Sequence, residues 1–293
     1  MGDHAEADEG DVSRPPVIII GMHRSGTSMM SRFLTESGMF FGWRVGSDFG
    51  EARYFQHLNQ WALTQASARW TQPDAMDDML ADERAVAAIS DFFATYSAGP
   101  RAYNFLGPAR LARRHSIQNL DEPWGWKDPR TTFTLPLWAN VFPDARIVHV
   151  IRHGVDAASS LRVRERRYTN SMVGKYWKKR SRYRIQMPKI RFSEGWSVLD
   201  IDQGVALWDK YVTRSKEHVA AYGDRAFEFR YEDMMADPGP IMEELFEFCR
   251  ITPPPDKSWA EAVEANRSLA YRDDEELVEV AERNAEILAR HGY

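Results

Sequence analysis

The eight residues from Gly21 to Ser28 carry the clearest chemical signal in this sequence, Gly-Met-His-Arg-Ser-Gly-Thr-Ser. They lie between a short β-branched run at 17–20 and a stretch with helical apolar spacing at 28–36. A glycine-rich loop at such a junction turns backbone N–H groups inward, and the positive end of the helix dipole adds to their field. The pattern therefore predicts a phosphate or sulfate site, in which His23 either contacts the ligand or only fills space.

The spacing of the two glycines matches the nucleotide-binding pattern G-x-x-x-x-G-K-[ST], but Thr27 stands where that pattern has lysine. The loop thus lacks the cation that grips the β- and γ-phosphates of ATP. Arg24 instead places a cation within the loop itself. We therefore expect an anion shorter than a triphosphate. A kinase-like P-loop enzyme and a non-catalytic nucleotide-binding protein are the alternatives.

The elements that position this loop follow from apolar spacing and from Pro and Gly punctuation. Alternating strands and helices imply right-handed crossovers, so we expect a three-layer α/β fold of P-loop type, with a central parallel sheet flanked by helices. The expected strands lie at 17–20, 124–126, 145–151 and 226–230. The expected helices lie at 28–36, 53–69, 82–97, 131–141, 155–161, 203–222, 239–249 and 274–290.

The chain has 293 residues, of which 43% are hydrophobic and 28% charged, a composition typical of globular proteins rather than disordered ones. Its single cysteine, Cys249, excludes an internal disulfide and a cysteine-rich metal site. The first 13 residues carry five acids and no Lys or Arg, which argues against a secretory signal. No apolar run is long enough to span a bilayer. These features predict a cytoplasmic protein.

The expected organisation is an acidic disordered tail over 1–14 and one domain over 15–293. Within that domain we expect a basic insertion at about 162–200 and a C-terminal helical tail from about 256. The basic insertion stands out because residues 162–191 hold twelve Lys or Arg and one acid, Glu165, on a chain whose net charge is −5. Such a local excess of positive charge predicts an anionic partner.

Aromatic residues interleave with these cations, for example Tyr176 and Trp177. The segment is either a solvated loop or a surface that stacks on sugar rings or nucleobases, or lies on an anionic lipid surface. Nucleic acid is the least favoured partner, because the sequence pI is about 5.9 and the basic footprint is a single segment. We expect a small-molecule, acidic carbohydrate or lipid-headgroup acceptor.

Four motifs in order resemble the sulfotransferase family that uses 3′-phosphoadenosine 5′-phosphosulfate (PAPS), most closely its bacterial and tyrosylprotein-type branches. The motifs are PPVIIIGMHRSGTS at 15–28, GWKDPR at 125–130, IVHVIRHGVDAASSL at 147–161 and FRYEDMMADP at 229–238. The resemblance implies transfer of the sulfuryl group of PAPS to a hydroxyl or amine, with 3′-phosphoadenosine 5′-phosphate (PAP) as the second product. It implies no metal requirement, because the transferred group is a weaker anion than a terminal phosphate.

The resemblance also implies roles for individual residues. Arg24 matches the position of the family's catalytic lysine or arginine, and Lys127 matches a lysine that helps to neutralise the transferring group. Arg152 and Ser160 fall on the 3′-phosphate site. Tyr231 and Glu232 match a motif that has a structural role in the family. The 5′-phosphosulfate site falls on Arg24, Ser25, Gly26, Thr27 and Ser28.

The acceptor hydroxyl also needs a base, and here the sequence departs from the family. Related bacterial enzymes carry a glutamate in a Tyr-Phe-Glu segment, whereas this chain has Gln56 at that position. A glutamine amide is not a useful proton acceptor. His57 and Glu51 are therefore the two candidate general bases.

Overall fold

We describe a computed structural model of the chain, which covers residues 13–45, 50–253 and 268–293. Four strands form one parallel sheet in the order β2-β1-β3-β4. The strands are β1 (Val17–Ile20), β2 (Gly125–Lys127), β3 (Arg146–Ile151) and β4 (Ala226–Arg230). All four match the expected strands to within one residue. The expected parallel α/β architecture is confirmed.

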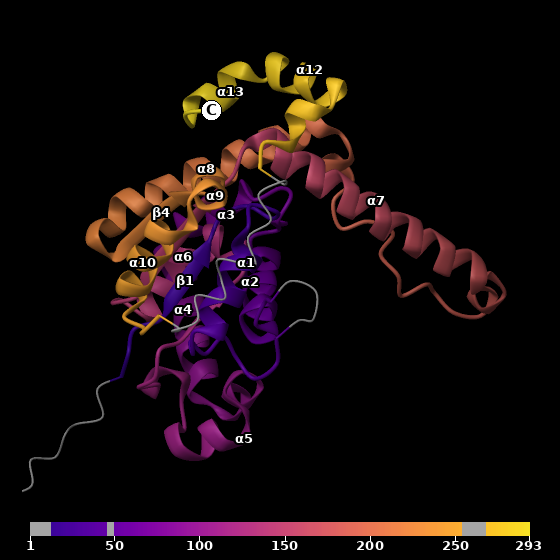
Figure 1. Cartoon of the computed structure of the whole chain (residues 1–293). Helices are drawn as coiled ribbons and strands as arrows, with labels where there is room; N and C mark the ends of the chain where they lie inside the picture. The colour runs from indigo at the N-terminus through magenta and orange to yellow at the C-terminus, as the bar shows by residue number, and fades with distance from the viewer. Residues whose placement is uncertain (1–12, 46–49, 254–267) are drawn as a thin grey trace, which may run out of the picture.

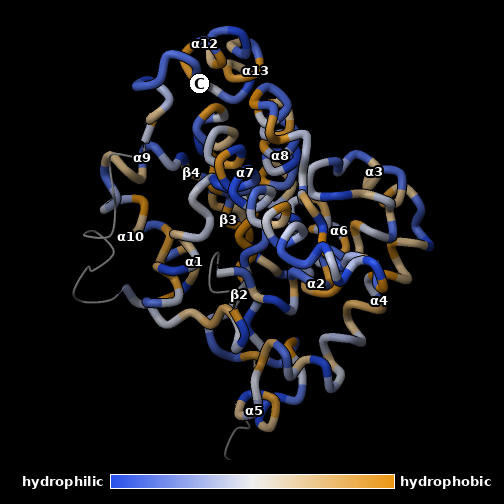
Figure 2. Tube along the Cα trace, turned by 90° about the vertical axis from the view of Figure 1, so that its right-hand side faces the viewer, coloured by the Kyte–Doolittle hydropathy of each residue, from blue (hydrophilic) through white to orange (hydrophobic). Residues whose placement is uncertain are grey.

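Both faces of the sheet are covered by helices, and the strands alternate between two cores. Ile18 and Ile20 of β1 belong to one buried cluster, whereas Val17 and Ile19 belong to the other. This alternation follows from the period of two of a β-strand, and it explains why β1 is apolar at every position. Figure 2 shows the two helical layers. One contains α1 (Thr27–Glu36), α9 (Tyr231–Ala236) and α10 (Pro238–Cys249), and the other α2 (Arg53–Gln65), α4 (Glu83–Ala98), α6 (Thr131–Val141) and α8 (Ile201–Tyr222).

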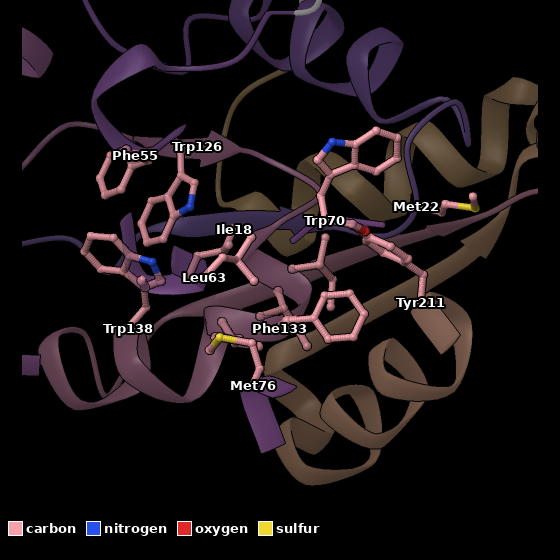
Figure 3. Packing of buried hydrophobic residues seen from close by; sticks show 14 of the residues in the cluster. Ile18, Met22, Phe55, Leu63, Trp70, Met76, Trp126, Phe133, Trp138 and Tyr211 are labelled. Atoms are coloured by element: carbon pink, nitrogen blue, oxygen red, sulfur yellow. The ribbon is translucent and has the colours of Figure 1, made fainter. Parts of the chain in front are cut away.

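Aromatic side chains fill the larger core (Figure 3). Phe55 of α2 stacks on Trp126 of β2 with ring centroids 4.0 Å apart and planes 5° from parallel. Trp138 of α6 meets Phe55 edge-on at 5.0 Å. Stacked and edge-on aromatic pairs add to the free energy gained by burying their area. They lock α2 and α6 against β2, which ends at Lys127.

Helix α7 (Gly154–Lys178) corrects the largest error of the sequence prediction. We expected a helix that ends at residue 161, but α7 continues for 17 more residues, to Lys178 within the basic segment. No proline occurs between 161 and 178, and five Arg or Glu residues fill 162–167, so the local sequence allows the helix to continue. In Figure 1 the second half of α7 extends away from the sheet, and the following chain returns alongside it.

Other helices also differ from the prediction. Helix α2 ends at Gln65 rather than at 69. Helices α3 (Ala75–Leu80) and α5 (Tyr103–Arg114) were not expected, the latter because its Gly107-Pro108 pair, with Gly107 at φ 71°, is typical of a turn. The expected helix at 274–290 is two helices, α12 (Glu275–Arg283) and α13 (Ala285–Arg290). Asn284 separates them and donates a side-chain hydrogen bond to Asp202 at 2.6 Å.

The tail formed by α12 and α13 packs against α7 and α8. Residues 268–293 of this tail are described, whereas its expected start near 256 and nearly all of the expected acidic tail lie outside the described residues. None of the helices in the described part of the chain is both long and apolar enough to cross a membrane.

Candidate active site

The Gly21–Ser28 loop leaves the carboxyl end of β1 and runs directly into α1. Three of its residues have positive φ angles, namely Gly21 at 125°, Arg24 at 73° and Gly26 at 100°. A Cβ on Gly26 would lie 2.6 Å from Cδ2 of Tyr231, so only glycine fits here. The Gly21 N–H donates to Oγ1 of Thr132 at 3.1 Å, which ties the loop to α6. This tight turn at a helix N-terminus has the backbone geometry that anion sites use.

The structure brings the two expected cofactor regions together. Arg24 donates from Nε to Oγ of Ser160 on α7 at 2.9 Å. Arg152, at the end of β3, donates from Nη1 to the Arg24 carbonyl oxygen at 3.3 Å and pairs with Asp156 at 3.5 Å. Its guanidinium also lies 4.7 Å from the ring centroid of Tyr231. Two guanidinium groups and a hydroxyl therefore adjoin the loop, a set that suits an anion with more than one charged group.

Lys127 links this loop to a carboxylate. Its Nζ donates to Oγ of Ser28 at 3.1 Å and to Oε1 of Glu51 at 3.2 Å. Gln56 donates from Nε2 to the other oxygen of Glu51 at 2.6 Å. Of the two candidate bases, Glu51 thus lies in contact with the other site residues. The glutamine at the position where a base was expected holds that carboxylate instead.

Burial changes the acid–base properties of this pair. The side chain of Lys127 is 1% exposed and that of Glu51 is 9% exposed. Loss of solvation raises the pKa of Glu51, an effect that the Lys127 ammonium opposes. Loss of solvation also lowers the pKa of Lys127, and here Glu51 opposes the change. A carboxylate whose pKa is raised is a better proton acceptor near neutral pH, which suits a general base.

A buried polar network next to Lys127 was not recognised from the sequence. Asp128 is fully buried and accepts hydrogen bonds from Nδ2 of Asn59 at 2.9 Å and from Nη1 of Arg130 at 3.0 Å. Asn59 also donates to Thr131 at 2.8 Å. Asp128 and Arg130 belong to the GWKDPR motif, but Asn59 on α2 carries no sequence signal. The network joins α2 to the end of β2 and so fixes the backbone that carries Lys127.

The two histidines occupy different surroundings. His23 is buried, and its ring meets Trp70 edge-on at 4.7 Å. Burial, reinforced by nearby Arg164, lowers the pKa of His23 well below its ordinary value, so this imidazole is neutral at pH 7. His57 follows Gln56 directly in α2, but its side chain is solvent-exposed.

The C-terminal tail reaches the Arg152 side of the site, which the sequence did not predict. The Tyr271 N–H donates to Oδ1 of Asp156 at 2.9 Å, and the Tyr271 ring stacks on His153 at 4.1 Å. Glu232 accepts from the His153 N–H at 2.9 Å and from the Tyr293 hydroxyl at 2.7 Å. The expected structural role of Glu232 agrees with these contacts, because its carboxylate joins the N-terminus of α7, helix α9 and the tail.

Comparison with solved structures returns bacterial sulfotransferases. The sulfotransferase from Alicyclobacillus acidocaldarius is 17% identical with a TM-score of 0.49, covering 95% of this chain and 94% of that one. Sulfotransferase STF9 from Mycobacterium avium is 16% identical with a TM-score of 0.44, covering 95% and 77%. The sulfotransferase domain of the Synechococcus PCC 7002 olefin synthase is 16% identical with a TM-score of 0.42, covering 93% and 95%.

Comparison with curated protein sequences returns no match. A family model described as the sulfotransferase family matches residues 15–255, a span that contains all four motifs and every expected site residue. The match specifies no branch, so the expected closeness to the tyrosylprotein branch stays a prediction. Because the model spans most of the sequence, this chain belongs to the sulfotransferase family.

Proposed function

We propose that this protein transfers the sulfuryl group of PAPS to a hydroxyl or amine of an acceptor, with Glu51 as the general base. The observation that carries the proposal is the continuous contact from Ser28 through Lys127 to Glu51. It joins the anion-binding loop, a buried cation and a carboxylate with a raised pKa in one place.

The residues present fit the donor. The turn at Arg24 and Gly26 presents backbone N–H groups at the start of α1, where a phosphosulfate would be held. Arg152 and Ser160 would hold the 3′-phosphate, because a guanidinium and a hydroxyl suit that dianion. When bound, PAPS supplies an activated sulfuryl group with a phosphate leaving group.

The reaction that these residues support is an in-line displacement at sulfur, similar to phosphoryl transfer. Glu51 accepts the proton of the acceptor hydroxyl while that oxygen bonds to sulfur and the bond from sulfur to the phosphate oxygen breaks. Arg24 and Lys127 stabilise the negative charge that gathers on the leaving and equatorial oxygens. Gln56 keeps the Glu51 carboxylate oriented by its hydrogen bond. For the acceptor, we propose an acidic carbohydrate or a lipid headgroup.

The test is incubation of the purified chain with PAPS labelled in the sulfuryl group and a panel of sugars, lipids and phenols. We expect label to pass to one acceptor class, and transfer to be abolished in Arg24→Ala and in Glu51→Gln. ATP with magnesium should neither support a reaction nor raise the melting temperature, whereas PAP should raise it. A chain that PAP stabilises but that labels no acceptor is a binding protein, and one stabilised only by ATP is a kinase-like enzyme.

A further inference from the structure

The basic segment at 166–193, here named the arm, projects away from the sheet and its covering helices (Figure 1). It comprises the second half of α7, the 3-10 turn at Arg180–Arg184 and the returning chain. At its base, buried Glu165 accepts hydrogen bonds from Oγ of Ser193 at 2.6 Å and from the Glu194 N–H at 2.7 Å. Farther out, Tyr176 stacks on Tyr183 with ring centroids 5.4 Å apart. These contacts hold the returning chain against the helix (Figure 1).

Positive charge covers the arm. It contains ten Lys or Arg and no Asp or Glu, although the whole chain has a net charge of −5. All ten are solvent-exposed in the structure: Arg166, Arg167, Lys175, Lys178, Lys179, Arg180, Arg182, Arg184, Lys189 and Arg191. Such a field attracts a surface that carries many negative charges, rather than a single anion.

Large apolar side chains project from the same part of the arm. Trp177 is 61% exposed, Ile185 is 89% exposed and Met187 is 84% exposed. In water each costs free energy that burial in an apolar medium would recover. A segment that mixes exposed cations with exposed aromatic and aliphatic side chains has the composition of interfacial membrane anchors, whose apolar groups enter the acyl boundary while the cations meet the headgroups.

We propose that the arm docks on an anionic lipid bilayer. Nucleic acid does not fit as well, because Ile185 and Met187 have no ring to stack on bases. A second copy of the chain fits less well too. Outside α7 and the chain that follows it up to Trp196, the exposed large apolar side chains of the described residues are Trp43, Val45 and Trp61, each less than half exposed. None of them is exposed to the degree of Trp177, Ile185 or Met187.

The inference does not depend on sulfuryl transfer. Lys178 is 18 residues beyond Ser160 on the same helix, so about 27 Å of helix separates the end of α7 from the proposed 3′-phosphate site. Vesicle binding can therefore be measured without donor or acceptor, and its failure would leave the proposed activity untouched.

The experiment is flotation of the full chain with two kinds of vesicle. One is phosphatidylcholine alone, and the other contains about 30 mole per cent phosphatidylserine, an anionic lipid. We expect binding to the anionic vesicles only, weakened by salt. Replacing Lys178, Lys179 and Arg182 together by Gln should weaken it about a hundredfold. The matched control replaces Arg84, Arg101 and Arg113, which are exposed on the body, and should retain full binding.

A second variant separates insertion from attraction of charges. Ile185→Ser with Met187→Ser removes no charge and no contact with the core, so we expect it to fold normally and to weaken vesicle binding about tenfold. Absence of binding to anionic vesicles overturns the proposal, as does equal loss in the arm and control triple variants. A dimer that light scattering detects and that the arm triple variant dissociates, without vesicle binding, would assign the arm to a second copy instead.

Discussion

The buried pair of Lys127 and Glu51 determines how the proposed activity should depend on pH. Glu51 must be deprotonated to accept a proton, and burial raises its pKa, so activity should fall as pH drops through a value above the ordinary glutamate range. Lys127 must be charged, and burial lowers its pKa, so activity should also fall as pH rises through a value below the ordinary lysine range. We expect a bell-shaped profile of kcat/KM.

The two limbs can be assigned separately. Lys127→Arg keeps a cation that does not lose its proton below pH 12, so it should remove the alkaline limb while leaving the acid limb in place. The measurement is kcat/KM against pH for both proteins with the same acceptor. An alkaline limb that is the same in the variant would mean that Lys127 is not the group that titrates there.

Arg152 is the residue whose loss should affect donor binding most directly. Arg152→Ala should weaken PAP binding by about 1.5–3 kcal/mol, the scale of a hydrogen bond to a charged group, which is roughly a 10- to 150-fold change. Arg162→Ala is the matched control. Arg162 lies on α7, ten residues beyond Arg152, and pairs with Glu276 of the tail at 2.6 Å. Calorimetry with PAP should find the control unchanged. Equal affinity in both variants would remove Arg152 from the 3′-phosphate site.

At the scale of elements, the anion loop depends on one glycine. Gly26→Ala must accept a backbone at φ 100° and a Cβ only 2.6 Å from the Tyr231 ring. We expect a loss of about 1–3 kcal/mol in the free energy of unfolding, measured with urea. Gly174→Ala is the control with the opposite sign: Gly174 lies within α7 and has no atom within 4 Å of a built Cβ. That variant should gain about 0.5–1 kcal/mol. If Gly26→Ala also gained stability, the loop would not be constrained as described.

Elements that carry local signals were predictable from the sequence, and elements that depend on distant contacts were not. Strand β1 is a β-branched run and β3 is mostly apolar, so their positions could be found from the sequence. The loop between β1 and α1 was recognised from the spacing of its two glycines. Helix α5 was hidden by Gly107-Pro108, and the length of α7 was missed because its basic residues were taken as an insertion.

The candidate site shows the same division. Arg24, Arg152 and Ser160 lie in motifs that could be matched in order. Glu51 remained one of two candidate bases, because its assignment rests on a contact with Lys127, 76 residues away in sequence. No pattern in a single sequence reports such a contact. Asn59, which helps to hold the Lys127 backbone, has no motif at all.

At the scale of the whole molecule, the tail extends the family domain. The family model ends at residue 255, whereas residues 268–293 pack on α7 and α8 beyond it. Through Tyr271 and Tyr293 the tail contacts Asp156 and Glu232, which lie beside Arg152. The tail thus supports the side of the site to which we assign the 3′-phosphate. Its folding should therefore be coupled to that of the domain.

Tyr293→Phe tests this coupling with the loss of a single oxygen. The Tyr293 hydroxyl donates to Glu232, and its ring lies 4.4 Å from the Arg230 guanidinium. The variant keeps the ring but leaves Glu232 with one fewer donor, so the free energy of unfolding should fall by about 1–2 kcal/mol. The control is Tyr183→Phe on the arm, whose ring packs on Tyr176 away from the domain core and should change stability by less than about 0.5 kcal/mol. A single urea transition in both variants, shifted only for Tyr293→Phe, is the expected result, since a tail that unfolded independently would leave the main transition in place and add a second one.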